Sequence, residues 1–424
     1  MVGFRILALA GVLVCTLGFD VAAQTPCQGR HVQSHLPAVQ TKGQPVADAP
    51  ALGAALQSAR GGETFLLASG NYGTLRLSAS YRSPVTIRSA DPAAPACFTH
   101  LVLEGARNVH LDGLYFDYTY SGGDPHFNAY FVLLDSTDIN IANSVFDGGT
   151  ARGTGTEADG YSTGIGLKIE RGGNLTLSGN EFRKWWTAVL AVQSRQLTFS
   201  GNNIHTIRSD GIDIDAADGL AIERNRFHDF GGAAGSQDHR DMIQIMRVSP
   251  RGSSDIVIRD NVFDMAGGDF TQTIWAGGDG KDLNNPVMRH RNVLVENNMI
   301  YNAHIHGISI HGSDNISIRK NSLIHVPDGH SVPAINISSD STSVVIEQNA
   351  VASIIGYQNQ RDWVVLNNAM IQDQSPSQGG YYDHEFIYYA RGRKNGYNEY
   401  GVRPGSQLDR LNAGSTLSKS YPSR

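Results

Sequence analysis

A short pattern of apolar and polar residues recurs along the chain from Ile139 to Val351. It consists of two apolar residues two positions apart, then polar residues, an asparagine and a further apolar residue. Uninterrupted copies are 22 or 23 residues long, and the others carry insertions. Self-similarity at such a period predicts a solenoid in which each repeat forms one coil. The asparagines of the pattern are Asn143, Asn180, Asn202, Asn225, Asn261, Asn298, Asn321 and Asn349.

A second strand is predicted in each coil, because apolar residues again alternate with other residues. Examples are Leu167/Ile169, Ile212/Ile214 and Ile308/Ile310. A leucine-rich repeat has a similar period, but it needs a leucine framework that this chain lacks. The pattern therefore favours an all-β fold, a right-handed parallel β-helix. We expect its asparagines to bond to backbone groups at the bends and to stack on one another from coil to coil.

Composition agrees with a β-solenoid. The 424 residues include 47 glycines, and 17% of them are charged. A solenoid grows by adding coils, so we expect one β-helical domain and a monomer. The net charge of −6 argues against nucleic acid as a partner, since no basic stripe is present to neutralise phosphates.

The regions outside the repeat predict export and an N-terminal cap. Arg5, an apolar run and Val21-Ala22-Ala23 are typical of a cleavable signal peptide, and the run is too short to span a bilayer. Residues 51–59 predict a short amphipathic helix that covers the first coil. The expected organisation is a signal peptide at 1–23, a cap at 24–80, the β-helix at 81–371 and a tail at 372–424, in a secreted or periplasmic protein without a membrane span.

Two cysteines stay in the mature chain, Cys27 and Cys97. In an oxidising compartment they predict one disulfide that joins the entry segment to the first coils. Two separate buried thiols are the alternative. No cysteine spacing typical of a metal site is present.

Candidate chemistry lies on the outward face of the second strand series. In-register coils place equivalent residues in columns about 4.8 Å apart. The central column predicts Asp213, Gln244 and Trp275 as consecutive steps of one wall. Around them the sequence predicts a substrate-binding set of Lys168, Gln244, Gln272, Trp275, His304 and His311.

Asp210, Asp213 and Asp215 lie within six residues, and Asp241 lies one coil along. Carboxylates this close repel one another, which raises at least one pKa unless a cation lies among them. A Ca²⁺ ion bound by Asp213, Asp215 and Asp241 is one explanation. The others are an acid–base pair for glycoside hydrolysis and a merely solvated acidic face.

Basic residues come next to this cluster. His239 and Arg240 follow a glycine-rich insertion at 231–237, Lys281 lies in a second insertion at 277–289, and His306 enters a later coil. Histidine can act as a base near neutral pH, and arginine can pair with a substrate carboxylate. The predicted catalytic set is His239, Arg240, Asp241, Lys281, His306 and Asp210.

These motifs resemble the pectate lyase-like superfamily of polysaccharide-active β-helix proteins over about residues 44–371. Asp210-Gly211, Arg240-Asp241 and the phrase 306–310 (His-Gly-Ile-Ser-Ile) are similar, in this order, to motifs of polygalacturonase-type glycosidases. Arg240 departs by replacing one of the paired acids, and the Gln272 coil is an extra one. The surroundings of Asp213 and the pair at 238–239 also resemble the Asp-Pro-His region of mannuronan C5-epimerases, without the proline.

The resemblance implies an enzyme of acidic polysaccharides. The leading hypothesis is a lyase that cleaves a uronate chain such as alginate or pectate by β-elimination. Arg240 would neutralise the substrate carboxylate, and His239 or Lys281 would be the base. A glycosidase that uses Asp210 and Asp241, a C5-epimerase and a non-catalytic carbohydrate-binding β-helix remain alternatives.

Overall fold

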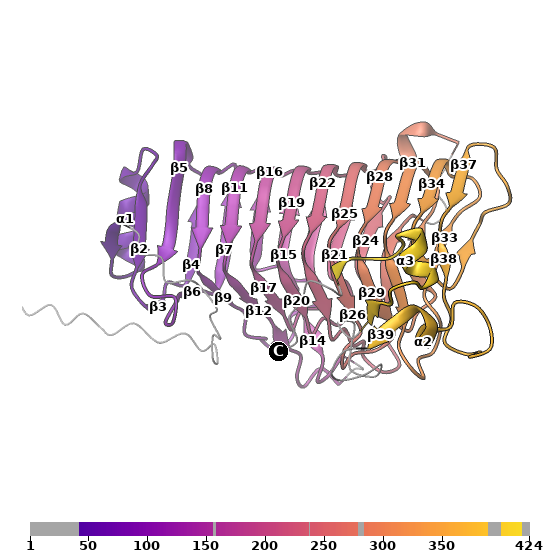
Figure 1. Cartoon of the computed structure of the whole chain (residues 1–424). Coiled ribbons are helices and arrows are strands. Elements are labelled where there is room, and N and C mark those ends of the chain that lie inside the picture. Colours follow the sequence, from indigo (N-terminus) through magenta and orange to yellow (C-terminus); the bar gives the residue numbers. More distant parts are fainter. Residues whose placement is uncertain (1–41, 156–157, 237, 279–283, 389–399, 418–424) are drawn as a thin grey trace, which may run out of the picture.

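The computed structural model describes residues 42–155, 158–236, 238–278, 284–388 and 400–417. The described residues between 44 and 370 wind into successive coils of a parallel β-helix (Figure 1). Each full coil contributes one strand to each of three long parallel sheets. The predicted fold is confirmed.

The first sheet contains the strands that the repeat pattern predicts. Their inward residues, such as Ile256 and Ile258, are buried in the core, while Val257 between them lies on the outer side. The 13 strands are β1 (Gln44–Val46), β2 (Thr64–Leu67), β5 (Ser80–Ser89), β8 (Arg107–Asp112), β11 (Thr137–Ala142), β16 (Gly173–Ser178), β19 (Arg195–Ser200), β22 (Asp218–Glu223), β25 (Ser254–Arg259), β28 (His290–Glu296), β31 (Ser313–Arg319), β34 (Thr342–Glu347) and β37 (Trp363–Leu366).

The second sheet contains the other predicted strand series and carries the candidate site. Its 11 strands are β4 (Thr74–Leu77), β7 (His100–Glu104), β10 (Phe131–Leu134), β15 (Ile165–Glu170), β18 (Thr187–Val192), β21 (Ile212–Asp215), β24 (Asp241–Met246), β27 (Gln272–Ala276), β30 (His306–Ile310), β33 (Ala334–Ile337) and β36 (Ile354–Ile355).

The third sheet follows the asparagine bend and contains shorter strands. Phenylalanines stack along its inner side, as Phe146 does on Phe116 and Phe182. Its 12 strands are β3 (Gly70–Asn71), β6 (Ala96–Phe98), β9 (Tyr115–Asp117), β12 (Val145–Asp147), β17 (Glu181–Arg183), β20 (Asn203–His205), β23 (Arg226–His228), β26 (Val262–Asp264), β29 (Met299–Asn302), β32 (Ser322–His325), β35 (Ala350–Val351) and β38 (Ala369–Met370).

A ladder of buried asparagines turns the chain from the first sheet to the third. Asn261 shows the pattern: its Nδ2 donates to Oδ1 of Asn298 at 3.0 Å and to the carbonyl of Ile222 at 2.8 Å. Its backbone N–H also donates to Oδ1 of Asn298. The predicted asparagine stacking is therefore confirmed from Asn180 onwards, and it continues to Asn368.

The first asparagine of the repeat does not belong to this ladder. Asn143 lies one position early, with a left-handed φ of 50°, and donates to Asp112. Ser144 takes the ladder position, and its N–H donates to Oδ1 of Asn180.

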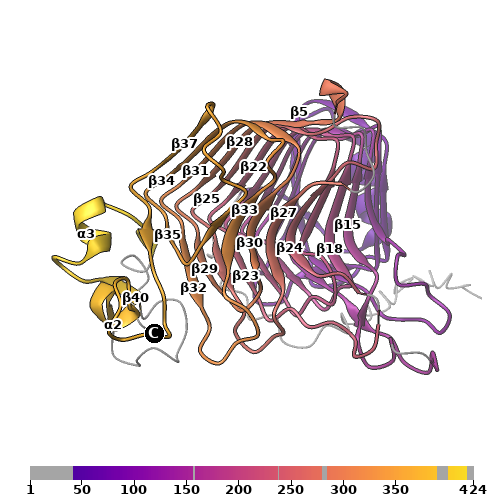
Figure 2. The same cartoon turned by 90° about the vertical axis from the view of Figure 1, so that its right-hand side faces the viewer.

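Helices and a C-terminal segment flank the solenoid. Helix α1 (Ala49–Ser58) lies at the N-terminal end, and Asp48 caps it by accepting from the N–H of Ala51 (Figure 1). Figure 2 shows the C-terminal elements outside the third sheet, on the other side of the solenoid from β24 and β27. The remaining elements are β13 (Gly149–Thr150), β14 (Ser162–Thr163), a 3₁₀ turn (Pro286–Met288), α2 (Tyr382–Glu385), β39 (Phe386–Tyr388), β40 (Tyr400–Val402) and α3 (Gln407–Leu411).

The C-terminal segment has its own apolar contacts with the third sheet. Tyr382 and Phe386 form a buried cluster with Tyr301 and Ile324. The hydroxyl of Tyr382 also accepts from the N–H of His325 at 3.0 Å.

Cys97 is buried and disulfide-bonded. Cys27 and the predicted signal peptide lie outside the described residues, so the predicted pairing and the cleavage site stay predictions. None of the helices in the described ranges is long and apolar enough to cross a membrane.

Candidate functional site

The candidate site lies where four neighbouring strands of the second sheet begin. In the strand register, Asp213 of β21 lies beside Gln244 of β24, which lies beside Trp275 of β27 and then Ser309 of β30. The predicted alignment of this central column is confirmed. At the start of β30 the register is irregular, and His306 lies beside Ala334.

A break in the alternation of β24 brings two polar residues to one face. Met242 and Ile243 are consecutive residues of the buried core. Two successive inward residues leave Asp241 before them and Gln244 after them on the outer side. Nε2 of Gln244 accordingly donates to Oδ2 of Asp241 at 3.2 Å.

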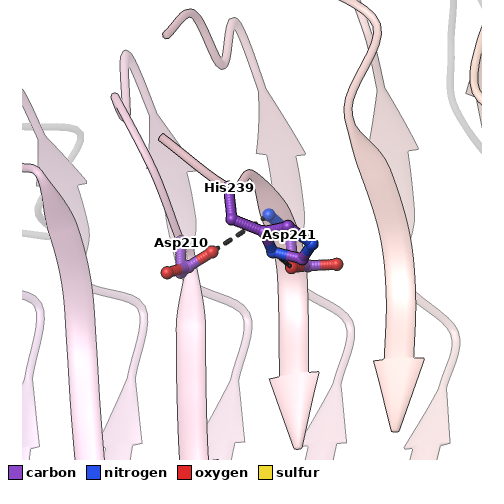
Figure 3. A group of neighbouring side chains, drawn as sticks. All are labelled: Asp210, His239 and Asp241. Atoms are coloured by element: carbon purple, nitrogen blue, oxygen red, sulfur yellow. Dashed lines mark hydrogen bonds and ion pairs between the residues drawn. The ribbon is translucent and has the colours of Figure 1, made fainter. Parts of the chain in front are cut away.

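His239 covers Asp241. Its Nδ1 lies 2.6 Å from Oδ2 of Asp241, and its side chain is 56% exposed whereas that of Asp241 is 0% exposed (Figure 3). The other ring nitrogen, Nε2, lies 2.6 Å from Nε2 of Gln272. These contacts fit a neutral ring that donates from Nδ1 to Asp241 and accepts at Nε2 from the Gln272 amide. The solvent-facing imidazole is thereby oriented by a buried carboxylate.

Two further carboxylates lie beside this pair. Oδ2 of Asp210 lies 3.0 Å from the Ser209 hydroxyl oxygen. Oδ1 of Asp210 accepts from the backbone N–H of Asp241 at 3.1 Å (Figure 3). Oδ1 of Asp213 is buried without a hydrogen-bond partner among the described residues, as is Oδ1 of Asp241. The cluster is therefore buried but incompletely paired.

Burial is the main cause of the altered acidity of these groups. It raises the pKa of Asp213 to about 7, with the charges of Asp241 and Asp215 adding to the effect. It raises the pKa of Asp210 well above its usual range, helped by the charges of Asp241 and Asp213. Burial also raises the pKa of Asp241, although the hydrogen bond from His239 acts in the opposite direction.

The segment that carries His239 is anchored on both sides of that residue. Asp238 accepts from Nε and Nη2 of Arg208 at 2.7 and 3.1 Å, and this ion pair is largely buried. Ser209 donates to the carbonyl of His239 at 2.5 Å. The repeat pattern did not predict these positioning residues. The available signal was the place of Arg208 and Ser209 directly before the Asp-Gly motif.

Asp215 does not join the cluster as the predicted calcium set required. Its carboxylate accepts from the N–H groups of Val248 and Ser249 at 2.9 and 3.0 Å and from the Ser249 hydroxyl at 2.5 Å. Both oxygens of Asp215 are therefore hydrogen-bonded to the turn that follows β24. The group whose ligand atoms do lie close together, within 4.8 Å of one another, is Asp210, His239 and Asp241.

This group fits calcium poorly. Ca²⁺ takes six to eight oxygen ligands, and here one of the three available donors is an imidazole nitrogen. The donor set that the structure brings together thus differs from the predicted one.

Trp275 forms one wall of a pocket of about 310 Å³ beside His239. Its ring lies 6.5 Å from the ring of His239 and 6.1 Å from that of His311, measured between centroids. The pocket is lined by His239, Gln244, Met246, Arg247, Val248, Trp275 and Gly278. Of the predicted substrate-binding residues, Gln244 and Trp275 thus line the same pocket, and His311 lies next to Trp275. Gln272 contacts His239.

Further histidines extend the site towards the next coil. Nδ1 of His306 lies 2.7 Å from the Ser309 hydroxyl, and the rings of His304 and His306 are stacked 5.2 Å apart. Burial lowers the pKa of His304 to about 4 and also lowers that of His306. Both rings are therefore neutral near pH 7, and each has one nitrogen that donates and one that accepts a hydrogen bond.

Among the described residues, the predicted basic residues Lys168 and Arg240 do not line the pocket. Lys168 lies two coils before Asp213 and pairs with Glu170 at 3.2 Å. Arg240 is half-buried, and its Nε has no hydrogen-bond partner in the described part of the chain. Lys281 lies outside the described residues.

Comparisons with known proteins agree with this architecture. The family model described as "Right handed beta helix region" matches residues 100–351, which is more than half of the chain. None of the curated proteins compared with the chain matches it.

Similar solved structures include an alginate lyase from Paenibacillus sp. str. FPU-7, with 14% identity, a TM-score of 0.39, and coverage of 69% of this chain and 99% of that one. PfbA, a surface adhesin of Streptococcus pneumoniae, has 14% identity, a TM-score of 0.47, and coverage of 76% and 84%. The A-module of mannuronan C-5 epimerase AlgE4 from Azotobacter vinelandii has 13% identity, a TM-score of 0.39, and coverage of 78% and 91%. Likeness at this level concerns the fold alone.

Proposed function

This chain belongs to the family of right-handed β-helix proteins, and from its site we propose that it is a polysaccharide lyase acting on a uronate-containing chain of the alginate or pectate type. The observation that carries the proposal is the exposed His239 ring held by the buried Asp241 at the edge of the pocket. An imidazole oriented in this way is equipped to remove a proton from a bound substrate.

The reaction needs a base at C5 of the uronate. Nε2 of His239 would take this proton once the substrate displaces the Gln272 amide. The electron pair then forms the C4=C5 double bond while the C4–O bond breaks, and the leaving oxygen takes up a proton. Asp241 stabilises the imidazolium that forms, because its carboxylate lies 2.6 Å from Nδ1.

Two other residues support this chemistry. Asp213 has a pKa of about 7, so it keeps a proton in much of the population near neutral pH and can supply one to the leaving oxygen. Arg240, whose side chain lies against Gly232 and acts electrostatically on His304, would supply the positive charge for the uronate carboxylate. No step of this reaction is routed through a cation.

A glycosidase is the second candidate, favoured by the three buried carboxylates with raised pKa. Hydrolysis needs two carboxyl groups that both reach the glycosidic bond. Asp241 is fully buried beneath His239, which argues against it in that role. An epimerase would share the first proton transfer but would leave the polymer uncut.

Product analysis on alginate and pectate separates these functions. A lyase gives ultraviolet absorbance from the new double bond and products whose summed mass equals that of the polymer. A glycosidase adds the mass of water at each cut, and an epimerase exchanges solvent deuterium without shortening the chain. We expect His239→Gln to slow the gain of absorbance about 10³-fold. The control His110→Gln, which changes a histidine on β8 of the first sheet, should leave it unchanged.

We further propose that the protein is exported to the periplasm or the medium, as the segment 1–23 predicts. N-terminal sequencing of protein recovered from those fractions should begin at Gln24. An intact N-terminus in the cytoplasmic fraction would contradict export.

A further inference from the structure

The group formed by Asp210, His239 and Asp241 has a donor set that suits a different cation from the one the sequence suggested. We propose that it binds a borderline divalent cation of the Zn²⁺ type in preference to Ca²⁺, and that this ion switches the site off. The proposed cation binding is independent of the proposed lyase activity, whereas the proposed inhibition by the cation rests on that activity.

The geometry of the three residues supports such a site. One ligand atom from each of them lies within 4.8 Å of the other two. Zn²⁺ binds imidazole nitrogen and carboxylate oxygen at about 2.0 to 2.2 Å. Asp241 is fully buried at the start of β24, and Asp210 is buried two residues before β21, whereas the His239 ring is exposed (Figure 3). A small movement of this exposed ring would close the site.

Incomplete pairing of the buried oxygens also favours a cation. Oδ1 of Asp241 and Oδ1 of Asp213 are buried without a hydrogen-bond partner in the part of the chain that the structure describes. Asp213 is only 8% exposed, and Asp210 and Asp241 lie within electrostatic reach of it. A buried carboxylate without a donor is costly, and a cation removes this cost.

Selectivity follows from the ligands that are available. Calcium would need several more oxygen ligands, but Asp215 is used by the N–H groups and the hydroxyl of the turn at 248–249. An imidazole nitrogen with carboxylate oxygens is a set that Zn²⁺ binds well.

Inhibition follows from the ring nitrogen of His239 that would bind the cation. Nδ1 is the ring nitrogen that faces Asp241. An ion on Nδ1 leaves the ring proton on Nε2, so the nitrogen proposed as the base can no longer accept a proton.

Calorimetric titration of the chelator-treated, full-length protein with Zn²⁺ and with Ca²⁺ tests binding without substrate. We expect one Zn²⁺ per chain with a Kd at least tenfold lower than that for Ca²⁺. Asp210→Asn and His239→Gln should each weaken Zn²⁺ at least tenfold. Asp218→Asn, an aspartate of the same coil on β22, should not change it.

Equal or tighter Ca²⁺ binding, no Zn²⁺ binding, or an unchanged Kd in His239→Gln would each overturn the proposal. Because a variant can misfold, pulsed electron paramagnetic resonance of the wild type with Cu²⁺, which like Zn²⁺ binds imidazole, gives an independent reading. Nitrogen coupling from an imidazole supports the site, and its absence contradicts it. If no uronan is cleaved but these signatures are found, the proposed function fails while the cation site stands.

Discussion

Nδ1 of His239 and Oδ2 of Asp241 lie 2.6 Å apart, and they join an exposed ring to a fully buried carboxylate. Asp241 is held at the start of β24, so it fixes the orientation of His239 from the strand rather than from the loop. The pair has the geometry of a base and its orienting residue.

Changing either member of this pair should lower turnover. We expect His239→Gln to reduce kcat about 10³-fold, since the base itself is lost. Asp241→Asn should also reduce kcat, by up to about 10⁴-fold, because an amide that donates to Nδ1 leaves the ring proton on Nε2, the nitrogen proposed as the base. Steady-state rates of double-bond formation check this, with His110→Gln as the control. A variant lacking His239 that keeps wild-type kcat would exclude this residue as the base.

Asp213 predicts an unusual dependence of stability on pH. Its pKa is raised from 3.8 to about 7 in the folded state. The folded protein therefore binds this proton more tightly than the unfolded chain, and the resulting stabilisation is present below pH 3.8 and lost as the pH rises towards 7. Asp213→Asn should exceed the wild type in free energy of unfolding at pH 8 by about 1 to 3 kcal/mol, and by little at pH 4.

Urea unfolding in the presence of a chelator measures the free energy of unfolding of each protein at pH 4 and at pH 8. Asp218→Asn is the matched control. Its free energy of unfolding should differ from that of the wild type by about the same amount at pH 4 and at pH 8. A difference for Asp213→Asn that is the same at pH 4 and pH 8 would show that the carboxyl does not titrate in this range.

Trp275 predicts a binding effect that is separate from chemistry. Its ring lines the pocket beside His239 without contacting the proposed proton path. Trp275→Ala should raise KM about tenfold with a smaller change in kcat, because the lost stacking acts on substrate and transition state alike. Trp275→Phe keeps an aromatic face and should recover most of the affinity. An equal fall of kcat in both variants would instead give Trp275 a part in the chemical step.

The asparagine ladder predicts a graded effect on stability. Asn261 is fully buried, and its removal leaves the carbonyl of Ile222 and the N–H of Asn225 without their partners. Asn261→Ala should lower the free energy of unfolding by about 2 to 4 kcal/mol. Asn368→Ala, at the last and partly exposed rung, should cost about 1 kcal/mol. Denaturation curves compare the two, and equal losses would mean that burial does not set the cost.

Much of the fold follows from the sequence because its cause is local and periodic. The asparagine repeat and the alternation of apolar residues specify coils, bends and register, so the repeat alone aligns Asp213, Gln244 and Trp275. The prediction failed by one position at Asn143, because the Ser144 hydroxyl accepts from the N–H of Leu114 and donates to the carbonyl of Ala142, as an asparagine amide can do at such a rung. Sequence pattern alone does not separate such neighbours.

The arrangement of the candidate site on the second sheet depends on side-chain contacts that the sequence repeat does not specify. Aspartates at 213, 215 and 241 look equivalent along the chain, yet Asp215 is bound by a turn and Asp241 is covered by His239. The two consecutive inward residues at 242–243 decide which side chains share the outer face. The sequence by itself determined the solenoid and the coils that carry the chemistry, because short-range periodicity specifies both. Only the tertiary structure decided which carboxylates remain free to act, because burial and pairing depend on loops packed from neighbouring coils.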